Sequence, residues 1–104
     1  MPSSKDYLCF ILEQLSGLED VTFTPMMGEF ILYYRGKIIG GIYDDRFLVK
    51  DTESANALMP DARREQPYEG AKEMLLVSDV DSKPFLEQLL QSMYDELPFP
   101  KKRR

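Results

Sequence analysis

The chain has 104 residues, enough for one domain with one hydrophobic core. It contains a single cysteine and no histidine, which excludes an internal disulfide and removes the commonest general base and the commonest zinc ligand. The net charge is −5, and residues 101–104 supply four of the 13 basic groups, so the part before them is more acidic still. An acidic protein repels phosphate backbones, so direct, specific nucleic-acid binding is not expected.

The first expected element is a helix from about Ser4 to Ser16. A serine cap followed three positions later by Asp6 is typical of a helix start, and Gly17 is expected to end the helix in a left-handed conformation. One apolar face recurs at spacings of three and four residues: Leu8, Ile11, Leu12, Leu15 and Leu18. Cys9 lies within this pattern, which favours a buried structural thiol over a nucleophile.

Residues 21–49 are predicted to form four consecutive antiparallel strands. In the first, Val21 and Phe23 alternate with threonines, and Pro25 marks the end of the strand. Three runs rich in aromatic and β-branched residues follow, namely Glu29–Tyr34, Lys37–Tyr43 and Arg46–Val49. Tight turns at Arg35-Gly36 and at Asp44-Asp45 join these runs into a meander.

The remaining elements alternate between helix and strand. Thr52 is expected to cap a short helix over Glu53–Leu58, and Asp61–Gly70 to form the longest loop. A strand over Glu73–Val77 precedes a last helix, which has cap residues in Asp79–Ser82, Pro84 in its first turn and Pro98 as its stop. This order predicts an α+β fold, a two-layer sandwich with a five-stranded antiparallel sheet and flanking helices. Residues 1–98 form the domain, and residues 99–104 are expected to be a basic, disordered tail.

Glycine and aspartate mark positions where the backbone is constrained. Gly28, Gly36 and Gly70 are interpreted as turn or loop residues, where a positive φ favours glycine, although Gly28 also leaves room for a ligand to approach. Gly40-Gly41 within a strand indicates a bulge or the close approach of a covering helix, or else a backbone surface left open for a ligand. Asp44 and Asp45 are interpreted as turn residues rather than metal ligands.

Two lysines are the best candidates for a binding site. Lys50 follows one predicted strand and Lys72 precedes another, so both are expected at one end of the sheet, beside a loop that carries Arg63, Arg64 and Tyr68. Such a cluster would accept a phosphate or carboxylate group. The alternative is ordinary surface salt bridges between the lysines and the carboxylates of residues 51, 69 and 73.

The sheet is expected to be apolar on both faces. Phe30, Leu32 and Tyr34 alternate with Ile31 and Tyr33, and the helices can cover only one of these two sets. An uncovered apolar sheet face predicts a homodimer. The alternative is that the tyrosines are simply half-exposed. A base-stacking platform of tyrosines is a further alternative that the absence of interleaved basic residues disfavours.

Several segments together resemble the N-terminal domain of the TfoX (Sxy) family. They are Met26-Met27-Gly28-Glu29, Tyr34-Arg35-Gly36, the run from Gly41 to Lys50, the run from Pro67 to Met74, and the final helix. The resemblance implies a fold similar to the secretion-chaperone-like proteins, with no enzymatic activity. Proteins of that family regulate natural competence together with the cyclic-AMP receptor protein at promoters. They also have a C-terminal domain similar to helix-hairpin-helix modules, so a stand-alone form of the N-terminal domain is expected here.

The expected function is therefore that of a non-catalytic regulatory or interaction module acting through protein–protein contacts. Its protein partner is not identified by the sequence. The alternative function is a small domain that binds an anionic ligand through Lys50, Lys72 and the loop of residues 61–70. No catalytic residue, metal or cofactor is expected. Since no apolar run approaches the roughly 18 residues that a membrane span needs, a cytoplasmic protein without membrane contact is expected.

Overall fold

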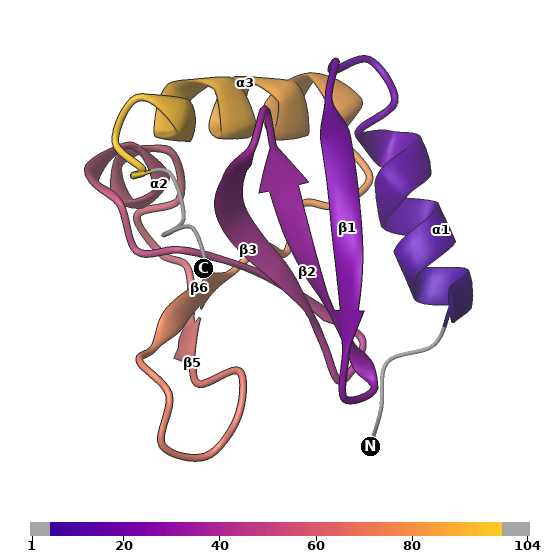
Figure 1. Cartoon of the computed structure of the whole chain (residues 1–104). Helices are drawn as coiled ribbons and strands as arrows, with labels where there is room; N and C mark the ends of the chain where they lie inside the picture. The colour runs from indigo at the N-terminus through magenta and orange to yellow at the C-terminus, as the bar shows by residue number, and fades with distance from the viewer. Residues whose placement is uncertain (1–4, 99–104) are drawn as a thin grey trace.

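Three helices and six strands follow one another in residues 5–98, the part of the chain that the computed structural model describes (Figure 1). In chain order they are α1 (Lys5–Gln14), β1 (Val21–Met26), β2 (Glu29–Tyr34), β3 (Lys37–Tyr43), β4 (Arg46–Val49), α2 (Glu53–Leu58), β5 (Arg64–Glu65), β6 (Met74–Leu76) and α3 (Lys83–Tyr94). The α+β class and the meander of the first four strands are confirmed. The tail predicted at residues 99–104 lies outside the described residues. Within residues 5–98, no helix is both long enough and apolar enough to span a membrane.

All six strands join one antiparallel sheet in the order β1-β2-β3-β4-β6-β5. The predicted count of five strands is wrong, because β5 lies inside the segment that we expected to be a loop. Arg64 and Glu65 pair there with Leu75 and Met74 of β6. A strand of two residues is too short to show a period in the sequence, so only its pairing reveals it.

Three tight turns build the meander, and each places two consecutive residues in the left-handed region. The φ angles are 52° and 85° at Met27 and Gly28, 52° and 86° at Arg35 and Gly36, and 54° and 57° at Asp44 and Asp45. Two positive φ angles in a two-residue loop are typical of hairpin turns whose twist matches that of the strands. Glycine adopts this geometry at little cost, and aspartate tolerates it better than most residues.

The helices and one face of the sheet enclose the hydrophobic core. The fully buried side chains come from α1, from alternate positions of the strands and from α3, and include Ile11, Leu32, Ile39, Ile42, Phe47, Leu86, Leu89, Leu90 and Met93. Figure 1 shows α3 crossing behind the strands and α1 lying beside β1. In β2 the buried positions alternate with half-buried ones, so Phe30, Leu32 and Tyr34 face the core while Ile31 and Tyr33 face away from it.

Two expectations for α1 are wrong. Cys9 is exposed, because it follows the buried Leu8 and so points away from the face that packs on the sheet. Gly17 is not among the residues with positive φ, whereas Asp20 has a φ of 62°. The helix ends instead in tightened turns, in which the Ser16 N–H donates to the Glu13 carbonyl at 3.2 Å.

The other two helices begin as predicted. The Thr52 hydroxyl accepts from the Ala55 N–H at 3.1 Å, and the Ser82 hydroxyl accepts from the Phe85 N–H at 3.4 Å. Pro84 occupies the first turn of α3, where a backbone N–H would have no hydrogen-bond partner within the helix, so its absence in proline costs nothing. The stop predicted at Pro98 is too late, since α3 ends at Tyr94.

The paired glycines of β3 lie against the backbones of both neighbouring strands. A β-carbon at Gly40 would lie 2.0 Å from the Leu48 carbonyl oxygen of β4, and one at Gly41 would lie 2.5 Å from the Phe30 carbonyl oxygen of β2. The β2–β3 register also shifts between Leu32 and Tyr33, which marks a bulge. The bulge interpretation therefore agrees with the structure, but the close approach comes from strands and not from a helix.

Candidate functional site

The lysine pocket is an open hollow of about 450 Å³ at the end of the sheet where β4 and β6 meet. Residues of β3, of the segment after β4 and of the segment before β6 form it. They are Ile38, Gly40, Tyr43, Lys50, Asp51, Pro67, Tyr68, Ala71, Lys72, Glu73 and Met74. Lys50, Lys72 and Tyr68 thus come together as expected from the sequence.

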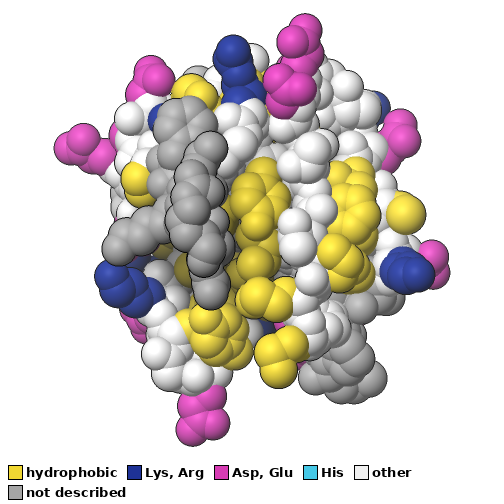
Figure 2. All heavy atoms as spheres, in the orientation of Figure 1, with side chains coloured by type: hydrophobic (Ala, Val, Ile, Leu, Met, Phe, Trp, Pro, Cys, Tyr) yellow, Lys and Arg dark blue, Asp and Glu magenta, His cyan; other side chains and the backbone are white. Residues whose placement is uncertain are grey.

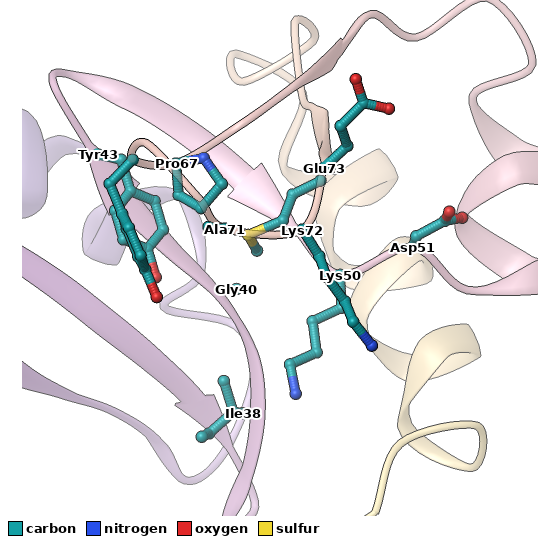
Figure 3. Close-up of a pocket in the computed structure, with 11 residues that line it drawn as sticks. Ile38, Gly40, Tyr43, Lys50, Asp51, Pro67, Ala71, Lys72 and Glu73 are labelled. Carbon is teal, nitrogen blue, oxygen red and sulfur yellow. The ribbon is translucent and has the colours of Figure 1, made fainter.

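Local structure explains how both lysines reach the pocket. The Lys50 N–H donates to the Ile39 carbonyl at 2.9 Å, which extends the β3–β4 pairing and fixes the backbone just past Val49. Lys72 comes two residues before β6, which pairs directly with β4. Figure 3 shows the ends of both lysine side chains on one side of the pocket and the Tyr43 ring on the other, with Gly40 between them.

The two predicted arginines have other roles. Arg64 Nη1 contacts Asp51 Oδ2 at 2.7 Å, and its Nη2 donates to Asn56 Oδ1 at 2.6 Å. Hydrogen bonds from Asn56 and Arg64 hold the pKa of Asp51 below its usual range. Arg63 is largely exposed and its nearest ion-pair partner is Glu65, at 3.8 Å. Neither arginine is among the described residues that line the pocket.

The lysines do not form the salt bridges given by the alternative interpretation. Within residues 5–98, no carboxylate lies within 4.0 Å of the ammonium group of Lys50 or Lys72. Figure 3 shows the Glu73 side chain extending away from the ends of both lysines, and Asp51 is already paired with Arg64. As far as residues 5–98 are concerned, both positive charges are therefore available to an anion.

Two tyrosines form the other wall. Their ring centroids are 6.4 Å apart, with Tyr43 buried and Tyr68 59% exposed. Burial is the main cause that raises the pKa of Tyr43, and the neighbouring Tyr68, Glu29 and Tyr33 act in the same direction. The Tyr43 hydroxyl therefore stays protonated at neutral pH and is able to donate a hydrogen bond. The predicted Gly70 has a φ of 88° in the loop beside this wall, with open space where a side chain would be.

A second surface covers the face of β1, β2 and β3 that is turned away from the helices. Cross-strand pairing places Thr22 beside Tyr33 and Thr24 beside Ile31, and it places Ile38 beside Tyr33. With Met26, which is 42% exposed, these residues form what we call the uncharged face: Thr22, Thr24, Met26, Ile31, Tyr33 and Ile38. Glu29 pairs with Met26 and borders this face on the same side of the sheet. Figure 2 shows apolar side chains gathered over the strands on the side turned to the viewer. Tyr34 lies on the core face, so the tyrosines do not form one platform.

Only part of this surface is predicted from the sequence. The apolar alternation of β2 indicates it, whereas the threonines of β1 show no apolar alternation on this side. The signal in β1 is the absence of any charged residue between Val21 and Gly28. Edge strands usually carry charges that prevent association, so an uncharged edge is informative.

Comparison with known proteins gives one clear relationship. The chain is 30% identical over 105 residues to a protein of Spirochaeta aurantia described as an uncharacterized 12.7 kDa protein in the trpE 5′ region. The match covers 100% of this chain and 91% of that protein. The chain belongs to the same family. No family model matches the chain, and no solved structure is significantly similar to it.

Similarity over nearly the full length of both proteins means that members of this family share the domain described here as a whole. The family relationship assigns no chemistry to the lysine pocket or to the uncharged face. Within residues 5–98, no three His, Cys, Asp or Glu side chains are grouped so as to hold a metal ion.

Proposed function

We propose that this protein is a non-catalytic interaction module that acts through protein–protein contacts, and that it forms a homodimer through the uncharged face. The observation that carries the proposal is that the core cluster lies on one side of the sheet, whereas the other side is covered only toward β4, where Tyr43 and Leu48 are buried. The opposite side of β1–β3 presents exposed threonines, half-buried Ile31, Tyr33 and Ile38, and the exposed Met26. Face-to-face packing of two sheets is a common way to cover such a surface.

Charge favours a second copy as the occupant of this face. Each chain has a net charge of −5, so two copies repel each other over most of their surfaces. The six residues of the uncharged face carry no ionic side chain. Glu29 borders them on the same side of the sheet, and its carboxylate already accepts a hydrogen bond from the Asp44 N–H at 3.1 Å. The face can therefore approach its own copy with little charge to remove from water. A two-fold axis would bring the same patch of both copies face to face, which suits a surface without charged side chains.

The regulatory role remains part of the proposal. The order of helix, four-stranded meander, short helix, two short strands and helix supports a TfoX-like N-terminal domain with a secretion-chaperone-like fold, as do the motifs from Met26 to Glu29 and from Gly41 to Lys50. In such a module the dimer is the unit that presents a surface to a further protein partner. Affinity capture with wild-type protein and with a monomeric variant would show whether that partner requires the dimer.

Light scattering coupled to size-exclusion chromatography tests the dimer directly. We expect wild-type protein at micromolar concentration to have twice the chain mass of 12.1 kDa. Thr24→Lys places a charge at an exposed position of β1 on the uncharged face, opposite Ile31, and should give a monomer with unchanged circular dichroism. Ala57→Lys adds the same charge at an exposed position of α2 and should remain dimeric. A monomeric wild type, or a Thr24→Lys dimer as stable as the wild type, would contradict the proposal.

A further inference from the structure

We infer that the lysine pocket binds a small organic anion, in which a phosphate or carboxylate group is joined to an apolar body. This site lies beside the uncharged face and Ile38 contributes to both, but its two lysines and its two tyrosines are not members of that face. The inference therefore does not depend on the homodimer, and the experiment below keeps the two apart.

The anionic group is recognised by the two ammonium groups. Lys50 and Lys72 line the same hollow, and neither has a carboxylate within 4.0 Å among residues 5–98. Lys50 is half-buried at the end of β4, so part of its charge is withdrawn from water and interacts more strongly with an anion than a fully exposed lysine does. Two cations on one anion also favour a group with several oxygens over a single neutral acceptor.

The surrounding charges leave this positive spot intact. Two acidic residues line the pocket, each next to one of the lysines in sequence, and the carboxylate of the first, Asp51, is held by Arg64 and Asn56. Glu73 lines the pocket, yet its side chain extends to the side opposite the lysine ends (Figure 3). A local excess of positive charge thus lies on a protein whose net charge is −5.

The apolar body is recognised by the rest of the lining. Ile38 and Met74 are half-buried, the Tyr43 ring is buried behind Tyr68, and Gly40 adds no side chain to fill the space between them. The hollow of about 450 Å³ has the size of a small-molecule site, which is generally apolar with a few polar groups that orient the ligand. A free inorganic anion would use the lysines alone and leave this apolar wall without contact.

The test is a titration of ¹⁵N-labelled full-length protein followed by amide chemical shifts. The probes are phenyl phosphate, benzoate, inorganic phosphate and phenol, each added at one ionic strength. We expect phenyl phosphate or benzoate to shift the amides of Gly40, Lys50 and Lys72, with an affinity at least about tenfold above that of inorganic phosphate and of phenol. The tighter of the two organic anions identifies the preferred head group.

Variants decide whether the two lysines are responsible for binding the anion. The Lys50→Gln/Lys72→Gln double variant should weaken binding of the preferred anion at least about tenfold, whereas Lys83→Gln, at an exposed position in α3, should bind like the wild type. Binding to Thr24→Lys should also be unchanged, which separates this site from the dimer. Equal affinity for phenol, equal weakening by Lys83→Gln, or shifts confined to the basic residues 101–104 would overturn the inference.

Discussion

At the scale of single residues, the strongest constraints come from backbone atoms that approach each other closely. Gly40 and Gly41 occupy adjacent positions of a central strand where any β-carbon would meet the backbone of β4 or β2. By contrast, a β-carbon at Gly17 would meet only the end of the Glu87 side chain, which is able to move aside. The two kinds of glycine look alike in sequence, and only their neighbours distinguish them.

Gly41→Val should therefore destabilise the protein by about 1 to 3 kcal/mol, because the Phe30 carbonyl and the Tyr43 ring leave no space for the new side chain. Gly41→Ala should show a smaller loss in the same direction. Denaturant unfolding followed by circular dichroism measures both. Gly17→Ala is the matched control and should change the free energy of unfolding by less than about 0.5 kcal/mol. An unchanged stability of Gly41→Val would show that β3 has more space than the structure indicates.

At the scale of elements, contacts far apart in sequence hold the ends of the helices. The Lys37 ammonium donates to the Tyr94 carbonyl at 2.9 Å and lies 4.0 Å from the centre of the Tyr94 ring, which connects the start of β3 to the end of α3. Glu96 follows α3 and accepts from the Ser54 N–H at 2.9 Å and from the Ser54 hydroxyl, in the first turn of α2. These contacts fix both helices to one end of the sheet.

The Glu96 contact should make stability depend on pH. Hydrogen bonds from the Ser54 side chain and backbone hold the pKa of Glu96 below its ordinary value of 4.5. A carboxylate with a lowered folded-state pKa stabilises the protein above its unfolded-state pKa, and this contribution is lost as the pH falls through the folded-state value. Glu96→Gln should thus be less stable than the wild type at pH 7.

Thermal unfolding of Glu96→Gln and the wild type between pH 7 and pH 3 measures this effect. The difference in melting temperature should shrink below about pH 4.5, where the carboxyl group begins to be protonated in the unfolded chain. Glu13→Gln, at an exposed position of α1, is the control for a general change of charge. A difference between Glu96→Gln and the wild type that stays constant with pH would assign the effect to shape rather than to charge.

At the scale of the whole molecule, charge separates the surfaces by the partners they can accept. The chain as a whole is acidic, the lysine pocket has two lysines in its lining, and the six residues of the uncharged face carry no ionic side chain. A duplex carries dense negative charge and needs a broad basic face, which a pocket with two lysines does not provide. A small anion and a second copy of the chain fit the two surfaces better.

The protein should consequently show no sequence-specific binding to duplex DNA. Any retention in a gel-shift experiment at about 150 mM salt should come from residues 101–104 and decrease only gradually with salt, because few phosphates are contacted. Deletion of these four residues is the decisive comparison. Sequence-dependent binding that survives the deletion would restore a direct role at promoters.

The sequence by itself determined the local features of this protein. Apolar spacing predicted α1 and α3, and Thr52 and the aspartate turn predicted the start of α2 and the turn between β3 and β4. Alternation in β2 separated Phe30, Leu32 and Tyr34 from Ile31 and Tyr33, and the structure shows that the first set faces the core. These predictions succeed because the physical signals, which are side-chain period, capping and turn conformation, act over a few residues.

Tertiary structure decided whatever depends on pairing between distant segments. Only pairing with β6 makes Arg64 and Glu65 a strand, and the orientation of α1 on the sheet leaves Cys9 exposed. The same pairing brings Lys50 and Lys72 to one pocket, but directs Arg64 to Asp51. The partner of a charged side chain depends on which strands are neighbours, and strand order is fixed by the packing of the whole core rather than by local preference.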